Sequence, residues 1–168
     1  MQTLAAFESL WQKKVPVHLV IVGAEGWKSL PDDQRCNIPE IMQTILRNRQ
    51  LGKKLFFLEG VNDEQLNALY ENSTCLIAAS EGEGFGLPLI EASRRGLPII
   101  ARDIPVFREV AGMHAYYFDG LEPATLAKAI NEWLNLYANG RHPKSSGLSW
   151  LTWKESVEAL KSVLLAKH

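Results

Sequence analysis

The sequence is short of several features that mark particular classes of protein. Its two cysteines, Cys36 and Cys75, lie far apart without a CxxC spacing, so two reduced thiols are favoured and a disulfide is the weaker alternative. No apolar run approaches the roughly 20 residues that span a membrane, and the N-terminus has neither the charged nor the apolar region of a signal peptide. A formal net charge of −1 gives no field to gather nucleic acid or anionic lipid. We therefore expect a soluble cytoplasmic protein that does not bind nucleic acid.

The 168 residues, 46% of them hydrophobic, suit one globular domain. Short apolar runs, each predicting a strand, lie at residues 18–22, 54–58, 74–78, 98–101 and 115–118. The first of them, residues 18–22, is expected to be a buried parallel strand. Amphipathic patterns predict helices at 4–11, 38–49, 63–70, 88–95, 106–110 and 123–137, and a polar linker leads to a last helix within 150–168. This alternation is typical of an α/β fold, a Rossmann-like parallel sheet with helices on both faces. Such a domain usually begins with a strand, so we expect its first strand to be absent from this sequence.

One stretch, residues 80–101, stands out because glycines alternate with other residues and a proline follows them. Gly82, Gly84 and Gly86 lie two apart, and Pro88 opens a helical pattern. Glycine lets a backbone approach a ligand closely, and the free N–H groups of a helix start attract anions. The stretch follows a predicted strand, at the edge of a parallel sheet where ligands bind. It indicates a phosphate site, with a tight turn that binds no ligand as the alternative.

Two glutamates flank this turn and cannot bind phosphate themselves. Glu83 lies among the glycines, and Glu91 follows eight positions later inside the predicted helix. Carboxylates at such places accept hydrogen bonds from hydroxyl groups, as on a ribose or another sugar. Amides for phosphate beside carboxylates for hydroxyls suggest a nucleotide-sugar. The competing interpretations are a contact of Glu91 with the helix dipole, worth roughly 0.3–1 kcal/mol, and an ordinary exposed loop position for Glu83.

The sequence of residues 79–110 resembles the donor-binding motif of the GT-B glycosyltransferases of family four, the retaining sugar transferases. That motif combines a glutamate, Gly-Phe-Gly-Leu-Pro, and a second glutamate eight positions after the first. Residues 83–88 and Glu91 match it without a gap. The earlier LVIVG and residues 56–69 follow the C-terminal domain of the family in order, so the resemblance covers nearly the whole chain. Within the family the sequence looks most like bacterial mannosyltransferases of surface polysaccharide and lipopolysaccharide assembly.

The resemblance implies roles for individual residues. Glu91 would hold the ribose hydroxyls of the donor. Glu83 would be the catalytic residue, in contact with the transferred sugar near the charge that develops at its anomeric carbon. Backbone amides would bind the diphosphate and sugar, and the base would lie after the second predicted strand. The amides are those of Gly84, Phe85, Gly86 and Leu87, and the residues near the base are Gly60 and Val61.

The resemblance also implies a substrate and a set of partners. GDP-mannose is the favoured donor and a UDP-sugar the alternative, with no cofactor and no metal required. The acceptor would be a glycan or a lipid-linked glycan, and the intact enzyme would be cytoplasmic, with a peripheral position at the inner membrane left open. Family members neutralise the diphosphate with an arginine and a lysine that follow the first strand of this domain. Lys13 and Lys14 do not correspond to those positions.

We therefore expect residues 1–168 to form a single nucleotide-sugar-binding domain, which is the donor half of a two-domain enzyme. The N-terminal acceptor domain is not matched, so this half alone should be inactive. A noncatalytic nucleotide or sugar-phosphate binding module is the alternative. Among other residues, Arg102 and Arg108 are expected in surface ion pairs, Cys75 in the core, and Trp27 near the donor or the cleft between domains.

Overall fold

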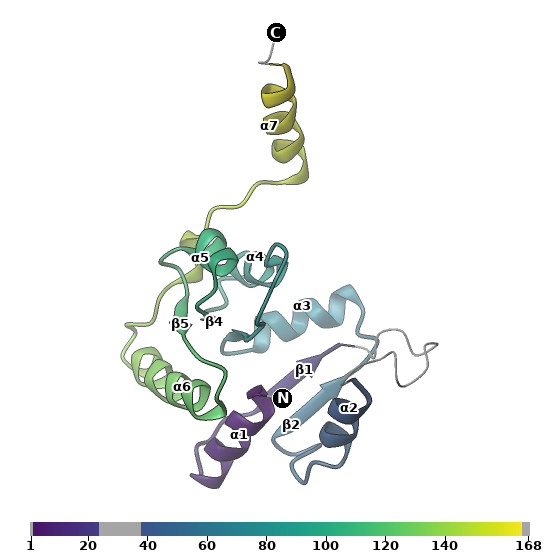
Figure 1. The fold of residues 1–168 in the computed structure, drawn as a ribbon, viewed down its shortest axis with the longest axis vertical. Coiled ribbons are helices and arrows are strands. Elements are labelled where there is room, and N and C mark those ends of the chain that lie inside the picture. The colour runs from purple at the N-terminus through teal and green to yellow at the C-terminus, as the bar shows by residue number, and fades with distance from the viewer. Residues whose placement is uncertain (1, 24–37, 166–168) are drawn as a thin grey trace.

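The structure, a computed structural model, describes residues 2–23 and 38–165 (Figure 1), so Trp27 and Cys36 lie outside the described residues. Each predicted helix and strand is present within a few residues of its expected bounds. The strands are β1 Leu19–Val22, β2 Leu55–Leu58, β3 Leu76–Ala78, β4 Ile99–Arg102 and β5 Tyr116–Phe118. The helices are α1 Gln2–Gln12, α2 Ile38–Leu46, α3 Asp63–Asn72, α4 Leu87–Ser93, α5 Pro105–Ala111, α6 Pro123–Ala138, the 3-10 turn Ser145–Gly147 and α7 Trp153–Leu165.

The strands pair in parallel, which confirms the predicted fold class, but they lie in two sheets. One sheet has the order β1-β2 and the other β3-β4-β5. Residues 18–22 were expected to form a buried strand, and this is wrong for half of it. Val20 and Val22 are each 39% exposed. The two exposed valines alternate with Leu19 and Ile21, so one face of the strand is less covered than the other. The strand also lines a cleft.

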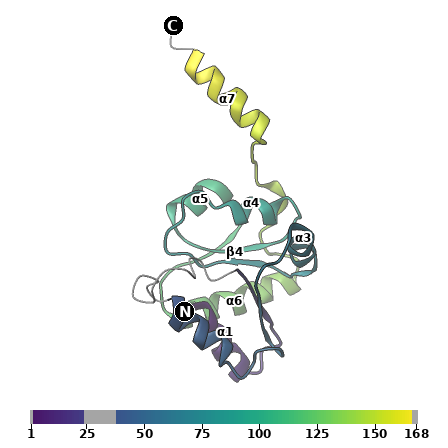
Figure 2. The ribbon, with the colours of Figure 1, turned by 90° about the vertical axis from the view of Figure 1, so that its right-hand side faces the viewer.

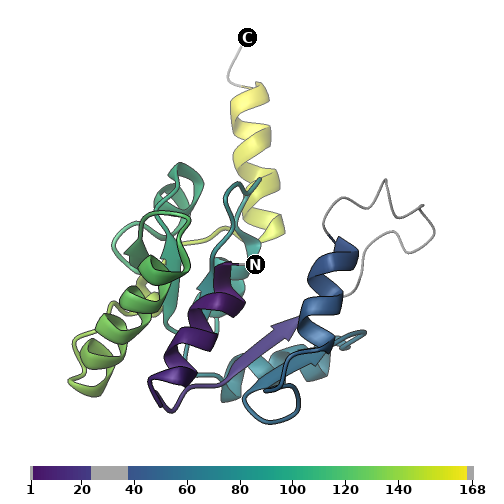
Figure 3. The same ribbon diagram turned by 60° about the horizontal axis from the view of Figure 1, so that its bottom comes forward.

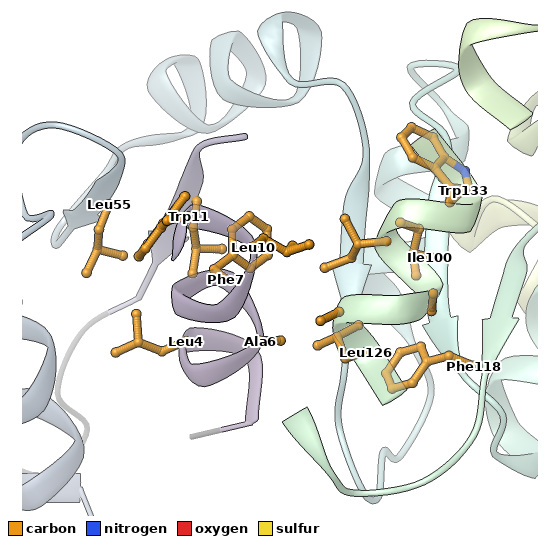
Figure 4. Packing of buried hydrophobic residues seen from close by; sticks show 14 of the residues in the cluster. Leu4, Ala6, Phe7, Leu10, Trp11, Leu55, Ile100, Phe118, Leu126 and Trp133 are labelled. Atoms are coloured by element: carbon orange, nitrogen blue, oxygen red, sulfur yellow. The ribbon is translucent and has the colours of Figure 1, made fainter. Parts of the chain in front are cut away.

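Strand β4 is the centre of the larger sheet and is buried at every residue. Its side chains alternate between two hydrophobic clusters, as expected when a strand has helices on both faces. Ile100 packs with Leu126 of α6 and with α1 (Figure 4). Ile99 points to the other side, into a cluster with Leu89 of α4 and Phe107 of α5. Figure 2 shows α4 and α5 on one side of β4 and α6 on the other.

Helix α1 lies beside α6 and leads into β1 (Figure 3). Its apolar residues recur at helical spacing, so Leu4, Phe7 and Leu10 share the face that is buried between the two sheets. Helix α3 begins at Asp63, as expected, and Asn62 is its cap. The Asn62 side chain accepts the Gln65 amide, and the Gln65 side chain accepts the Asn62 amide, a reciprocal capping box.

The C-terminal helix α7 stands apart from the other elements in all three ribbon views (Figures 1–3). None of its residues is buried, and its apolar side chains Val157, Leu160 and Val163 are about half exposed or more. The elements that carry the glycine loop lie on the other side of the 140–152 connection. Helix α7 therefore contributes nothing to the packing of that loop.

Candidate functional site

The glycine loop, residues 80–86, joins β3 to α4 and ends in a left-handed residue. Gly86 has φ 78° and ψ 34° and directly precedes the helix, whose first turn contains Pro88. Because Gly86 packs against the ring of Phe107, an added Cβ would lie 3.4 Å from that ring. Helix α4 has only seven residues, so its dipole is short. Anion binding here would depend mainly on the loop amides themselves.

Gly86→Ala is expected to lower the free energy of unfolding by about 1–2 kcal/mol, because a left-handed conformation costs a residue with Cβ that much. The midpoint of thermal unfolding should fall by roughly 2–8 °C. Gly84→Ala is the matched control, since its φ is not in the left-handed region and its Cβ would meet nothing within 4 Å. Equal midpoints for the two variants would contradict the strained turn.

Glu83 is exposed and lines the cleft beside β1 and β3. Its carboxylate accepts the backbone N–H of Gly84 at 3.1 Å. One of the amides expected to bind an anion is therefore paired with the neighbouring side chain in this structure. An anion that accepts from the Gly84 amide must displace the Glu83 carboxylate.

Glu91 lies on α4 in a half-buried position and is held by a residue of another helix. The Tyr70 hydroxyl of α3 donates to Glu91 Oε2 at 2.8 Å. Burial, followed by this hydrogen bond to a carboxylate, raises the pKa of Tyr70, so the phenol remains a donor. Arg95 packs on the ring of Tyr70 at 4.8 Å and also donates to Asn67. These contacts fix the direction of the carboxylate, and no donor from the described part of the chain is seen at its other oxygen.

Tyr70 is the residue that sequence reasoning missed. Its helical spacing with Leu66 and Leu69 placed it on the apolar face of α3, which is true of its ring but not of its hydroxyl. Tyr70 lines the same cleft as Glu83. Glu83 and Tyr70, the hydrogen-bond partner of Glu91, therefore line one cleft. The two carboxylates do not contact each other.

Gly60 and Val61 lie at the other end of α3. They follow β2, and Gly60 takes a left-handed φ of 65° just before the cap of the helix. Tyr70 is seven residues beyond the start of the helix, which corresponds to about 10 Å along its axis. Helix α3 therefore separates the two residues expected near a base from the residue that holds Glu91 by about two turns.

Arg102 is buried and is not in a surface ion pair, contrary to expectation. It donates to the carbonyl groups of Ala79 and Ser80 at 2.9 and 3.0 Å, at the start of the glycine loop. It also donates to the Gly120 carbonyl and to the side chain of Gln2. The guanidinium is stacked on the ring of Phe118 at 5.1 Å. Arg102 thus ties three distant segments together, and its donors are occupied by the protein.

The other arginines after the loop are also engaged. Arg108 forms the expected exposed ion pair with Asp103, with N–O distances of 2.7 and 2.6 Å. The hydrogen bond from Arg108 holds the pKa of Asp103 below its usual value. Arg94 packs on the ring of Trp150 at 4.8 Å. Among the described residues, each arginine between positions 94 and 108 contacts other groups of the protein, and none of them is left unengaged beside the glycine loop.

Two kinds of feature are absent from residues 2–23 and 38–165. No group of three or more histidines, cysteines and acidic residues there could hold a metal ion. No helix in the same residues is both long enough and apolar enough to cross a lipid bilayer.

The chain is similar to several known proteins. Residues 2–147 match the family model of the group 1 glycosyl transferases. The chain is 50% identical over 159 residues to the serotype-specific mannosyltransferase WbdA of Escherichia coli, a match that covers 95% of this chain and 18% of that protein. The chain therefore spans less than a fifth of the length of this relative.

Two solved structures share the fold. The sucrose-phosphate synthase of Thermosynechococcus elongatus superposes with a TM-score of 0.68 at 21% identity, over 99% of this chain and 43% of that one. HepE of Anabaena, solved with UDP and glucose, gives a TM-score of 0.55 at 18% identity, over 84% of this chain and 45% of that one. The chain belongs to the group 1 glycosyl transferases and has the α/β fold of a GT-B glycosyltransferase domain.

Proposed function

We propose that this chain is the donor-binding domain of a retaining mannosyltransferase that uses GDP-mannose in the assembly of a bacterial surface polysaccharide. The observation that carries the proposal is Glu91. It is a half-buried carboxylate beside a glycine loop, oriented by the Tyr70 hydroxyl at 2.8 Å, in a chain half identical to a mannosyltransferase. A carboxylate fixed in this way is prepared to accept hydrogen bonds from a hydroxylated ligand.

In this proposal each part of the site binds one part of the donor. Glu91 accepts the ribose hydroxyls, and the amides of residues 84–87 bind the diphosphate and the sugar. Glu83 leaves the Gly84 amide when the diphosphate arrives and meets the hydroxyls of the transferred sugar. The base lies toward Gly60 and Val61, about two turns of α3 from Tyr70. The complex of HepE with UDP and glucose supports a nucleotide-sugar as the ligand class.

The chemistry requires stabilisation of a departing nucleoside diphosphate while an acceptor hydroxyl approaches the same face of the sugar. The loop amides can supply part of that stabilisation. The described arginines of positions 94–108 are engaged by other groups of the protein, so other cations must complete it. We therefore propose that this domain binds the donor but transfers no sugar alone. The glycan or lipid-linked acceptor would be bound by the N-terminal domain of the longer enzyme.

The proposal is tested by calorimetric titration with GDP, GDP-mannose, UDP and ADP. Guanine nucleotides should bind most tightly. Glu91→Ala should weaken GDP binding by about 10- to 100-fold, because a hydrogen bond to a charged group is worth roughly 1.5–3 kcal/mol. Tyr70→Phe should weaken binding by a smaller factor, since it loosens the carboxylate but leaves it in place.

The matched control for this titration is Glu71→Ala, which removes an exposed glutamate next to Tyr70 on the same helix. It should bind GDP as the parent does. If Glu91→Ala binds GDP as tightly as Glu71→Ala, the ribose role of Glu91 is wrong. If none of the nucleotides binds at millimolar concentration, the assignment of this chain as a donor site is wrong.

A further inference from the structure

Helix α3 has little apolar burial to hold it in the fold. None of its ten residues is buried, whereas α1 and α6 each bury five. Its leucines, Leu66 and Leu69, are half-buried and line the cleft. Because an apolar face packed on the core is what stabilises most helices in proteins, α3 depends on polar contacts more than α1 and α6 do.

Two residues of α3 face two residues at the end of α4. Asn67 and Tyr70 are three positions apart and so lie on one face of α3. Glu91 of α4 and Arg95 of the turn after it are four positions apart. The Tyr70 hydroxyl donates to the Glu91 carboxylate, and the Arg95 guanidinium donates to the Asn67 side chain. We call these four residues the α3–α4 clasp.

Arg95 contacts each of the other three members of the clasp. Its Nη1 donates to the backbone carbonyl of Glu91 at 2.8 Å, which anchors the side chain to the end of its own helix. Its Nη2 donates to Asn67 of α3. The centre of the guanidinium lies 4.8 Å from the centroid of the Tyr70 ring, within the range of a cation–π contact. One planar group thus bridges the two helices and covers the ring whose hydroxyl holds Glu91.

Helix α3 also joins the two ends of the proposed nucleotide site. Gly60 and Val61, which the proposed function places near the base, precede the cap of this helix, and Tyr70 lies about 10 Å along its axis. Because a hydrogen-bonded helix of this length is stiff, a movement at the Tyr70 end also moves the end that follows Gly60 and Val61. The place of the base contact is therefore set, through α3, from the end that holds Glu91.

We propose that Arg95 is a positioning residue, which holds α3 on α4 and so places the ribose contact and the base contact relative to each other. The assignment of ribose and base rests on the proposed function, whereas the attachment of α3 by Arg95 does not. Arg95 contacts no part of the donor in this proposal. It acts through the Tyr70 ring and through Asn67, and its loss should reduce the preference of the site for guanine.

The first measurement is hydrogen exchange of backbone amides by NMR in the 168-residue chain without a ligand. In Arg95→Met, the amides of residues 67–71 should exchange about tenfold faster than in the parent, because a hydrogen bond from a charged group and a cation–π contact are lost together. Arg94→Met is the matched control, since Arg94 lies next to Arg95 but packs on Trp150. It should leave the exchange of α3 unchanged. Equal exchange of α3 in the two variants would overturn the proposal.

The second measurement is the ratio of the UDP to the GDP dissociation constant, obtained by calorimetric titration. Arg95→Met should lower this ratio by about fivefold or more, as expected when two coupled contacts are separated. Arg94→Met should keep the ratio of the parent. Arg95→Lys should fall between the two, because an ammonium group keeps the charge but lacks the planar fork. A loss of stability alone would weaken both nucleotides by the same factor and leave the ratio unchanged.

Asn67→Ala covers the case in which Arg95→Met does not fold. It removes the acceptor on α3 and leaves Arg95 in place. Alanine favours a helix more than asparagine does, so faster exchange at Leu69 and Tyr70 would come from the lost contact and not from a weaker helix. Glu71→Ala, at an exposed position of the same helix, is its control and should leave the exchange at both residues unchanged.

Failure of this inference and failure of the proposed function give different results. Guanine-selective binding that Arg95→Met leaves unchanged overturns the coupling through α3, while the proposed function stands. A parent chain that binds no nucleotide overturns the proposed function and the coupling with it. The exchange measurement then still decides whether Arg95 holds α3, because it needs no nucleotide. If Asn67→Ala exchanges as slowly as Glu71→Ala, Arg95 does not hold the helix.

Discussion

Arg102→Ala is expected to lower the free energy of unfolding by about 3–4 kcal/mol, since carbonyl oxygens on two separate loops lose a buried, charged donor at once. The side chain is 5% exposed and donates to Ala79, Ser80 and Gly120. The midpoint of thermal unfolding should fall by roughly 6–16 °C, as measured by circular dichroism or calorimetry.

Arg108→Ala is the matched control, because Arg108 lies six positions later and pairs with Asp103 on the surface. Its midpoint should stay close to that of the parent, since exposed ion pairs are screened by solvent. Arg102→Lys should fall between the two, because one ammonium group cannot reach carbonyls on several segments. Equal midpoints for Arg102→Ala and Arg108→Ala would show that the buried guanidinium is not a structural clamp.

Cys75 is expected to react with iodoacetamide about 50-fold more slowly at pH 8 than an ordinary cysteine. Burial raises the pKa of its thiol to about 12, so the thiolate at pH 8 is roughly 2,000-fold scarcer than for a pKa near 8.5. The higher basicity of that thiolate returns a factor of about 40 in intrinsic reactivity. The rate, followed by mass spectrometry in a Cys36→Ser background, should rise about tenfold per pH unit up to pH 10.

Unfolding in urea should remove this protection and is the internal control for the reagent. The rate in urea should match that of a short cysteine peptide. If the folded chain reacts at pH 8 as fast as the peptide, the thiol of Cys75 is not buried enough to raise its pKa. The interpretation of Cys75 as a core residue, and not as a nucleophile, would then fail as well.

Local features of the fold followed well from the sequence, because the signals for them are local. Helix periodicity defined α1 and α6, and glycine and proline marked both ends of α4. The burial of β1 was overestimated for a physical reason. The run from His18 to Val22 has the composition of a strand covered on both faces, and its composition cannot tell whether its neighbour is present.

The contacts that shape the site were less predictable, because they join residues far apart in the sequence. Arg102 follows an apolar strand and precedes Asp103, so it resembles a surface position. Its carbonyl acceptors lie 18 to 23 residues away on other loops. Tyr70 and Glu91 are 21 positions apart on two helices. No spacing rule within one helix or strand could have paired them.

Because α7 is separate from the other elements, their packing does not depend on it. No side chain of that helix is buried, so cutting the chain after Trp150 would uncover no interior surface and would leave the Arg94 contact with Trp150 intact. The shorter product would keep every group assigned to the donor. It would lose the exposed leucines and valines of α7, which favour aggregation in concentrated samples. Crystallisation and spectroscopy of the donor site are therefore best begun with residues 1–150.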